Sequence, residues 1–349
     1  MHNLKNKTVG VIGATGYAGL ELVRFLLVHP DVTLHKISSV SFTGQPLSAV
    51  YPALYGICDM LCVDAPEVIE SCDVIFAALP HGLSEETAKA CMEKNKVFID
   101  LGADFRLEDE ATYEAWYGAP FAVPALHNKA VYGLPELNRA AIQETTLVAN
   151  PGCYPTSVAL GLMPVLTHGF IETSGLIVDS KSGVSGAGRG LSQNTHFPDC
   201  NEAFSAYKVA SHRHTPEMEQ TLSKMANTPV TLTFVPHLLP VNRGILSTIY
   251  ASLKKEVTEA EVRALYEEVY AEEPFVRVLP AGVGVNISQV RGSNYCDIQI
   301  YIDTHTNGLI VTSVIDNMVK GAAGQAIQNM NIVCGFAETA GLTGIPTAF

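Results

Sequence analysis

The sequence predicts an α/β protein of two domains: a doubly wound parallel sheet over residues 1–150, then an α+β domain with a largely antiparallel sheet. The chain has 349 residues, which is more than one ordinary hydrophobic core spans. Strand-like and helix-like segments alternate in the first part, as they do in parallel sheets. Beyond residue 175, segments rich in β-branched residues follow one another with few helices between them, which favours an antiparallel sheet.

The first domain is expected to begin with a strand, a glycine turn and an amphipathic helix within residues 7–30. A continuous apolar run at 72–82 is typical of a strand that is buried on both faces of its sheet. The helix after it is expected to have Ser84 as its N-cap, because a serine oxygen can accept a hydrogen bond from the free amides of the first turn. The remaining elements are a strand at 33–40, the helix itself over 83–95, and a strand with its loop at 96–107.

The second domain is expected to open with a strand and a glycine- and serine-rich loop at 175–190. One helix, 258–274, carries a capping box in which Thr258 and Glu261 bond each other's backbone amides. A final helix, 316–333, contains enough small residues to pack closely against another element. The expected strands lie at 230–240, 244–255, 296–304 and 308–316.

Composition and charge exclude several classes of protein. The formal net charge of −13 argues against nucleic-acid binding, which needs clustered lysine and arginine. The longest apolar runs, such as 74–80, are too short to cross a bilayer, and no apolar signal-peptide core is present, so a cytoplasmic location is expected. The eight cysteines form no C-x-x-C pair and no zinc-like spacing with histidine, so no metal site is expected.

The glycine turn GATGYAG indicates a dinucleotide site. Gly13, Gly16 and Gly19 follow a strand and open a helix, so the backbone can approach a pyrophosphate at the helix N-terminus; a purely structural turn is the alternative. The second strand ends in Ser38 and Ser39 rather than in a carboxylate, and hydroxyl groups accommodate the 2′-phosphate of NADP. The cofactor contacts expected here are Gly13, Thr15, Gly16, Tyr17, Ala18, Ser38 and Ser39.

The stretch ANPGCYPTS places Cys153 between a Pro-Gly turn and a Tyr-Pro pair. The apolar run 156–166 is typical of a buried helix, so the thiol is expected near a helix N-terminus, where free amides and the helix dipole favour the thiolate. A reactive thiol is one interpretation. The other is a small apolar residue that fills a gap in the core.

A nucleophilic thiol needs a base, and the segment HRHTPE (212–217) concentrates the candidates. His212 and His214 are the candidate bases, and Glu217 is spaced so that it could hold an imidazolium formed on His212. The alternative is a polar loop that caps a helix, with Thr215 as the N-cap.

In their order along the chain, these motifs resemble the N-acetyl-γ-glutamyl-phosphate reductases of arginine biosynthesis. The segment NPGCYPT and the helix KGAAGQA are specific, whereas glycine turns occur in many families. Val40 departs from the resemblance, because many members have an arginine there as part of the 2′-phosphate site. The matching segments are GATGYAG (13–19), ALPHG (78–82), DLGADFRL (100–107), YGLPELNR (132–139), NPGCYPT (150–156), SGVSGAGR (182–189), HRHTPE (212–217), RGSNYCD (291–297) and DNMVKGAAGQAIQNMN (316–331).

The resemblance implies a reaction through a cysteine thioester. Cys153 would attack the acyl phosphate and expel phosphate, and NADPH would reduce the thioester to N-acetylglutamate semialdehyde. His212 would transfer protons, with His214 as the second candidate and Glu217 orienting His212. The expected substrate contacts are Asn150, Ser182, Ser185, Gly186, Arg189, Arg213 and His214.

The resemblance also implies a domain arrangement. The dinucleotide-binding domain would consist of 1–150 and 316–349, with Pro80 and Asn317 among the cofactor contacts. Residues 151–315 would form a catalytic and oligomerisation domain similar to the C-terminal domain of glyceraldehyde-3-phosphate dehydrogenase. The expected partners are a small acyl-phosphate substrate and further copies of the chain, in a homodimer or homotetramer.

Three other functions stay open on the sequence alone. Aspartate-semialdehyde dehydrogenases share the glycine turn and the thiol chemistry, but HRHTPE and the terminal helix fit them poorly. A reductase of α-aminoadipyl phosphate differs by one methylene in its substrate, which a pocket distinguishes by only ~1–3 kcal/mol. A non-catalytic NADP-binding regulator is the third, and the intact set of Cys153, His212 and Glu217 argues against it.

Overall fold

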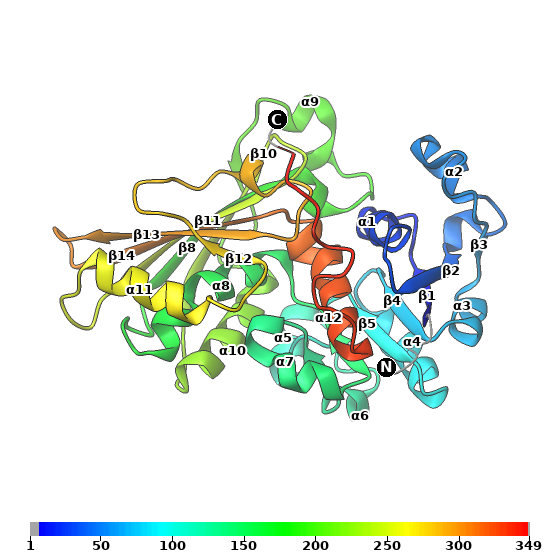
Figure 1. Cartoon of the computed structure of the whole chain (residues 1–349), viewed down its shortest axis with the longest axis horizontal. Helices are drawn as coiled ribbons and strands as arrows, with labels where there is room; N and C mark the ends of the chain where they lie inside the picture. Colours follow the sequence, from blue (N-terminus) through cyan, green and yellow to red (C-terminus); the bar gives the residue numbers. More distant parts are fainter. Residues whose placement is uncertain (1–6, 348–349) are drawn as a thin grey trace. The chain divides into compact units, whose positions relative to one another are not determined.

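The computed structural model describes residues 7–347, which divide into two compact units (Figure 1). Unit 1 consists of the chain up to Pro151 together with Ala322–Thr343, and unit 2 consists of Gly152–Gly321 together with the chain from Gly344 on. The return to the first unit therefore comes later than predicted. Residues 316–321, Asn317 among them, belong to unit 2 rather than to the dinucleotide-binding unit.

Unit 1 is built on a seven-stranded sheet of order β3-β2-β1-β4-β5-β7-β6, and all its neighbouring strands are parallel. From the central strand β1, the chain first winds toward β3 and then continues on the other side from β4, which confirms the predicted doubly wound sheet. The strands are β1 (Lys7–Ile12), β2 (Val32–Ser38), β3 (Cys62–Val63), β4 (Val74–Ala77), β5 (Val97–Asp100), β6 (Val131–Tyr132) and β7 (Leu147–Ala149).

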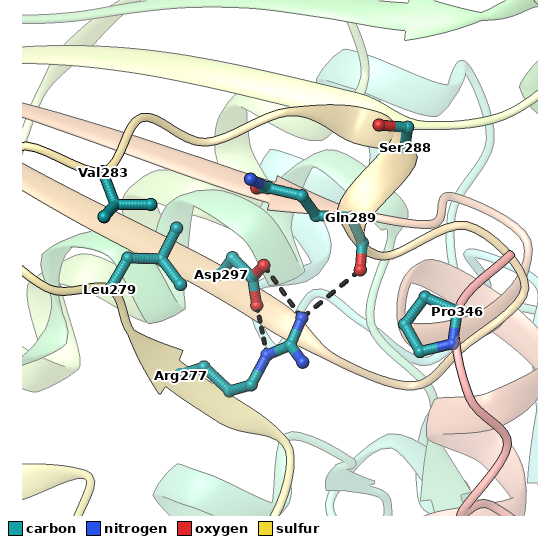
Figure 2. Close-up of a pocket in the computed structure, with 7 residues that line it drawn as sticks. All are labelled: Arg277, Leu279, Val283, Ser288, Gln289, Asp297 and Pro346. Carbon is teal, nitrogen blue, oxygen red and sulfur yellow. Dashed lines mark hydrogen bonds and ion pairs between the residues drawn. The ribbon is translucent and has the colours of Figure 1, made fainter. Parts of the chain in front are cut away.

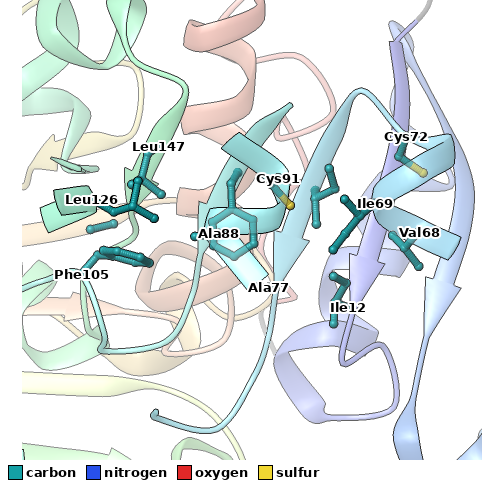
Figure 3. Close-up of a cluster of buried hydrophobic side chains, with 13 residues drawn as sticks. Ile12, Val68, Ile69, Cys72, Ala77, Ala88, Cys91, Phe105, Leu126 and Leu147 are labelled. Atoms are coloured by element: carbon teal, nitrogen blue, oxygen red, sulfur yellow. The ribbon is translucent and has the colours of Figure 1, made fainter. Parts of the chain in front are cut away.

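Unit 1 also contains helices, several of which pack against this sheet. They are α1 (Tyr17–Leu26), α2 (Leu47–Val50), α3 (Ala65–Ser71), α4 (Ser84–Glu93), α5 (Glu110–Tyr117), α6 (Pro124–His127), α7 (Pro135–Glu144) and α12 (Gly324–Cys334). Figure 3 shows part of the core, in which Val68 and Ile69 of α3 and Ala88 of α4 pack with side chains of the central strands. The same core contains Cys72 and Cys91; burial raises the pKa of the Cys91 thiol to about 12, so this cysteine is a neutral core residue.

Unit 2 is built on a second seven-stranded sheet, of order β12-β13-β14-β11-β8-β10-β9. Four of its neighbour pairs are antiparallel, while β8 with β10 and β12 with β13 are parallel, so the sheet is largely antiparallel as predicted. The strands are β8 (Leu176–Gly183), β9 (Ser205–Ala206), β10 (Leu232–Leu239), β11 (Ile245–Ser252), β12 (Val276–Val278), β13 (Cys296–Asp303) and β14 (Gly308–Ile315).

The helices of unit 2 are α8 (Cys153–Thr167), α9 (Phe197–Cys200), α10 (His214–Ala226) and α11 (Glu259–Val269). Helix α8 is buried on nearly all sides, which explains its almost continuous apolar sequence. A buried serine cluster joins α8 to the sheet: the Ser157 hydroxyl lies 3.0 Å from that of Ser247 and 3.1 Å from that of Ser313. These hydroxyl groups satisfy one another, so the polar atoms carry no uncompensated burial cost.

Predictions about helix ends had mixed outcomes. The capping box of Thr258 and Glu261 is confirmed at the start of α11. Ser84 is not an N-cap; Leu83 has that position, and the Ser84 hydroxyl instead donates to Asp100. Thr215 is not an N-cap either, because α10 already begins at His214. The expected continuous helix 316–333 is a π-helical turn, Val319–Ala323, followed by α12.

Within residues 7–347, no helix is long and apolar enough to cross a bilayer. The same part of the chain contains no group of three or more His, Cys, Asp or Glu side chains arranged to hold a metal ion.

Candidate active site

The glycine turn of unit 1 brings backbone atoms into close contact. Gly13 has a φ of +86°, and a side chain there would meet the carbonyl oxygen of Ala78 at 2.3 Å. A side chain on Gly19 would lie 2.2 Å from the Gly13 carbonyl oxygen. Helix α1 begins at Tyr17 with Gly16 as its N-cap, so no side chain at the N-cap position covers its first amides. This arrangement fits the pyrophosphate of a dinucleotide, which needs close backbone approach and helix N-terminal donors.

The end of β2 lies beside this turn. The Ser38 carbonyl oxygen accepts hydrogen bonds from the amides of Gly13, at 3.0 Å, and Ala14, at 2.9 Å. The hydroxyl groups of Thr15 and Ser39 lie 2.7 Å apart and are buried. No carboxylate occupies this strand end, and Val40, which follows it, is 94% exposed. The structure thus brings together four of the predicted cofactor residues, although they lie some twenty residues apart in the chain.

Tyr51 also reaches this turn, and the sequence analysis missed it. Its hydroxyl group donates to the Thr15 carbonyl oxygen at 2.9 Å. The residue lies directly after the short helix α2, in a stretch without strand or helix periodicity, so no local pattern marks it.

The loop after β4 contains Pro80, a predicted cofactor residue, and it is held by a buried carboxylate. Asp104 accepts hydrogen bonds from the backbone amides of Gly82 and Ser84, both at 2.8 Å. The Nδ1 atom of His81 lies 2.6 Å from the same carboxylate, which is inaccessible to solvent. Asp104 thus fixes the loop that leads from β4 into α4.

A second buried carboxylate, Asp100, lies below this loop. It accepts from the Ser84 hydroxyl at 2.6 Å and from the Gly102 amide at 2.9 Å. Burial raises the pKa of Asp100 to about 7, and the nearby Asp104 adds to the rise, while the hydrogen bond from Ser84 opposes it.

In unit 2, Cys153 is the first residue of α8, and Gly152 is the N-cap. The thiol therefore lies at a helix N-terminus as predicted, where the amide groups and the dipole stabilise negative charge. The side chain is partly exposed, unlike those of Cys58, Cys62, Cys72, Cys91 and Cys296, which are buried.

The candidate base His212 lies in an aromatic cage. Its ring centroid is 5.6 Å from that of Tyr154, 5.6 Å from that of Tyr207 and 5.3 Å from that of Phe234. Burial, together with the positive charges of Lys208 and Arg213, lowers the pKa of His212 to about 4, so the imidazole is neutral at pH 7.

The cage connects His212 to the cysteine. Tyr154 follows Cys153 in the first turn of α8, and the hydroxyl groups of Tyr154 and Tyr207 lie 3.0 Å apart. The His212 Nδ1 atom accepts a hydrogen bond from the His214 amide at 3.1 Å, so the neutral ring carries its proton on Nε2, which can donate to a reacting group. Both predicted bases therefore belong to the surroundings of α8.

Glu217 is fully buried in the first turn of α10, and its carboxylate accepts a hydrogen bond from the Gly152 amide at 2.7 Å. This contact is one that the sequence analysis did not foresee, since it expected Glu217 to act on His212. The carboxylate holds the residue immediately before Cys153.

The glycine- and serine-rich loop that follows β8 is held in place by hydrogen bonds to other loops of unit 2. The Ser185 hydroxyl donates to the Asn242 carbonyl oxygen at 2.5 Å and accepts from the Asn317 amide at 3.0 Å. The Asn317 Oδ1 atom accepts from the Gly244 amide at 2.8 Å. Ser182 is buried, whereas Gly186, Arg189 and Arg213 are exposed.

Asn150, a predicted substrate residue, is 1% exposed and belongs to unit 1. Its side chain donates to the Ala322 carbonyl oxygen at 3.1 Å and accepts from Asn329 at 3.1 Å. These partners give it a structural role in connecting β7 with α12.

Arg243 is a cation that the sequence analysis missed. Its side chain is 30% exposed and lies 3.5 Å from the buried carboxylate of Asp316. It follows Asn242, which binds Ser185, so it belongs to the same group of loops.

Unit 2 also has a pocket of about 420 Å³, which is lined by Arg277, Asp297 and neighbouring residues (Figure 2). Figure 2 shows that its cation, Arg277, is bonded to Asp297 and to Gln289. Arg277 donates to the two carboxylate oxygens of Asp297 at 2.6 and 2.9 Å and to the Gln289 carbonyl oxygen at 3.3 Å. None of the predicted site residues lines this pocket.

Comparison with known proteins identifies both units. Residues 8–145 match the semialdehyde dehydrogenase NAD-binding domain, and residues 153–317 match the semialdehyde dehydrogenase dimerisation domain. Solved structures with a similar fold include aspartate semialdehyde dehydrogenase II of Vibrio cholerae, with a TM-score of 0.73 at 17% identity over 94% of this chain and 98% of that one. The NADP complex of the Candida albicans enzyme has a TM-score of 0.71 at 17% identity, over the same shares of both chains.

Curated relatives are far more similar in sequence. An N-acetyl-gamma-glutamyl-phosphate reductase of Clostridium beijerinckii is 55% identical over 98% of this chain and 99% of that protein. One of Desulforamulus reducens is 54% identical over 96% of this chain and 97% of that protein. The resemblance found in the motifs is thus confirmed: the chain belongs to the N-acetyl-gamma-glutamyl-phosphate reductases, a family of oxidoreductases with a semialdehyde dehydrogenase NAD-binding domain and a dimerisation domain.

Proposed function

We propose that the chain catalyses the NADPH-dependent reduction of N-acetyl-γ-glutamyl phosphate to N-acetylglutamate semialdehyde and phosphate, a step of arginine biosynthesis. The observation that supports the proposal is a partly exposed cysteine at the first position of a buried helix, followed by Tyr154, whose ring centroid lies 5.6 Å from that of the neutral His212 imidazole. The 55% identity to a reductase of that name supports the choice of substrate.

In the first step, the Cys153 thiolate attacks the γ-acyl carbon, phosphate leaves, and a thioester remains. The helix N-terminus stabilises the negative charge on sulfur before the attack. His212 is proposed to take part in proton transfer, because its low pKa keeps the imidazole neutral at pH 7 and its Nε2–H can donate to a reacting oxygen. The amides at the start of α8 are donors for the oxyanion of the tetrahedral intermediates.

The nicotinamide cofactor supplies the hydride that reduces the thioester. The turn of Gly13, Gly16 and Gly19 would hold its pyrophosphate. We propose NADP rather than NAD, because β2 ends in Ser38 and Ser39 beside Thr15 and lacks the carboxylate that binds the ribose hydroxyls of NAD. An exposed Val40 leaves room for the 2′-phosphate but provides no positive charge.

The loop 182–189 is proposed to receive the phosphate group, with Ser182, Ser185, Gly186 and Arg189 as candidates, and Arg213 as a second cation. Hydrogen bonds from Asn317 and to Asn242 hold Ser185 in this loop. A loop fixed in this way can bind an anion with little loss of entropy.

We also propose that one face of the unit 2 sheet is covered by further copies of the chain, in a homodimer or homotetramer. Ile177 pairs with Tyr250 across neighbouring strands, and Tyr250 and Tyr301 both pair with Ile310, so these side chains lie on one face. Ile177, Tyr250 and Tyr301 are 45%, 40% and 38% exposed in the single chain. Light scattering on the wild type and on Tyr250→Glu tests this, and a monomeric wild type would contradict it.

The activity is tested in the oxidative direction, by phosphate-dependent reduction of NADP⁺ with N-acetylglutamate semialdehyde, followed at 340 nm. Cys153→Ser is the control, and the aspartate and α-aminoadipate semialdehydes are compared in parallel. We expect turnover with the first substrate only, lost in the variant. Turnover with another aldehyde instead would overturn the substrate, and activity that survives in Cys153→Ser would overturn the nucleophile.

A further inference from the structure

Gly321 lies directly against the predicted nucleophile. A side chain on Gly321 would place its Cβ atom 2.7 Å from the Cβ of Cys153, 3.2 Å from its Cα and 3.2 Å from Cδ1 of Ile315. A contact of 2.7 Å between two Cβ atoms is not tolerated in folded proteins, so one of the two backbones would have to move. Gly321 lies in a helical turn, a conformation open to any residue; glycine is needed here for space.

A defined turn produces this close approach. Gly321 is the middle residue of the π-helical segment Val319–Ala323, and its amide donates to the Asp316 carbonyl oxygen at 3.0 Å, closing the wide turn. The Asp316 carboxylate is buried and accepts from the amides of Gly292, at 2.7 Å, and Met318, at 2.8 Å. Such π-turns are rare and occur frequently at functional sites.

The residue before the cysteine is fixed as well. The Gly152 amide donates to Glu217, and the Gly152 carbonyl oxygen accepts from the amide and the hydroxyl group of Thr156, both at 2.9 Å. The chain on the N-terminal side of Cys153 is thus held by three hydrogen bonds, and its Cα–Cβ bond is in contact with Gly321.

We propose that Gly321 is a positioning residue for the Cys153 thiol. The absence of a side chain lets the π-turn contact the Cα and Cβ atoms of Cys153, which fixes the direction in which the sulfur points. The inference rests on the proposed role of Cys153 as the nucleophile. Because a displacement of about 1 Å at a reacting group can cost ~10²-fold in rate, even one added methyl group should impair the thiol.

The test compares Gly321→Ala with Gly284→Ala, a control at an exposed glycine of the same unit where an added Cβ meets nothing within 4 Å. Two quantities are measured in the full-length protein: kcat with N-acetylglutamate semialdehyde, and the rate at which iodoacetamide alkylates Cys153, read from the mass of its peptide. We expect Gly321→Ala to lower kcat by ~10–100-fold and to change the alkylation rate and its pH profile, with KM changed less than kcat. Gly284→Ala should behave as the wild type does.

A rescue variant separates positioning from general loss of packing. Ile315→Val removes the Cδ1 atom on the other side of the glycine, so the double variant Ile315→Val/Gly321→Ala gives the new methyl group room to move away from Cys153. Partial recovery of kcat and of the alkylation rate is expected. Should Gly321→Ala alone not fold, the double variant is compared with Ile315→Val, and equal alkylation rates in those two would overturn the proposal.

A folded Gly321→Ala with the kcat and alkylation rate of the wild type would overturn it as well. The failure of the proposed function has a different signature. In that case the wild type would not turn over any of the three aldehydes, while alkylation of Cys153 would still differ between the wild type and Gly321→Ala.

Discussion

The carboxylate of Glu217 accepts a hydrogen bond from the backbone amide of Gly152, 65 residues away along the chain. Both groups are buried, and the bond joins the first turn of α10 to the N-cap of α8. An amide at a helix N-cap has no partner within its own helix, so this carboxylate satisfies it. The residue that follows the bonded amide is Cys153.

We expect Glu217→Ala to lower both stability and activity, because it leaves the buried Gly152 amide without its acceptor. The loss of a buried hydrogen bond to a charged group costs ~1–3 kcal/mol of unfolding free energy. Glu217→Gln keeps an oxygen acceptor and should retain most of both. Urea denaturation and kcat measurements on the two variants test this, and equal losses in both would show that the charge, rather than the bond, matters.

His212 should make stability depend on pH in a defined direction. Its pKa is about 4 in the folded protein and near 6.5 when exposed, so between these values the unfolded chain binds a proton that the folded chain does not. This contribution is therefore fully present above pH 6.5 and is lost as the pH falls toward 4. Urea denaturation at pH 7 and pH 5 should show that His212→Asn loses less unfolding free energy between these two pH values than the wild type does.

The same substitution should reduce turnover without abolishing it. General acid–base catalysis contributes about 10²–10⁴-fold, so kcat of His212→Asn should fall within that range. His214→Asn is the matched comparison, because the imidazole of His214 lies in the same cage, 4.8 Å from that of His212. A larger loss in His214→Asn would exchange the two proposed roles.

Asp104 is expected to support cofactor binding through the loop that contains Pro80. Asp104→Ala removes the acceptor of the Gly82 and Ser84 amides, so the dissociation constant of NADPH, measured by fluorescence titration, should rise. The control is Asp109→Ala, which removes the N-cap of α5 in the same unit. That variant should lose ~0.5–2 kcal/mol of stability and keep its affinity for NADPH.

Asp100 should act on stability in the opposite direction to His212. Its folded pKa of about 7 lies above the value of an exposed aspartate, so the folded chain retains a proton that the unfolded chain loses. The stability from this group is present below pH 4 and is lost as the pH rises to about 7. The free energy of unfolding should therefore fall less between pH 5 and pH 8 in Asp100→Asn than in the wild type. The same fall in both proteins would contradict this.

The sequence predicted the parts of the site that depend on neighbouring residues. The turn of Gly13, Gly16 and Gly19 and the helix-terminal position of Cys153 both follow from short motifs, because strand, turn and helix are determined locally. The wrong N-caps, Ser84 and Thr215, show the limit of that approach. Ser84 has the right chemistry for a cap, but its hydroxyl group finds a buried carboxylate 16 residues away.

Contacts between residues that are distant in the chain could not be predicted from the sequence. Asn317 was expected among the cofactor contacts; the hydrogen bonds of its amide with Ser185 and Gly244, which lie 132 and 73 residues away, were not foreseen. The contact of Gly321 with Cys153 is equally invisible in the sequence, since a glycine in a small-residue helix indicates close packing without naming the partner. Such contacts depend on how loops converge in three dimensions, which no local pattern specifies.

Unit 1 is built from two segments that are far apart in the chain, so it can be completed only late in synthesis. Ala326, Ile327 and Met330 of α12 are fully buried, and Asn329 donates to the Gly133 carbonyl oxygen at 2.8 Å, so the first 151 residues cannot complete this core until α12 has been made. Almost all of unit 2 is synthesised before then. A chain that ended shortly before residue 322 would expose, in its early half, the apolar surface that α12 normally covers.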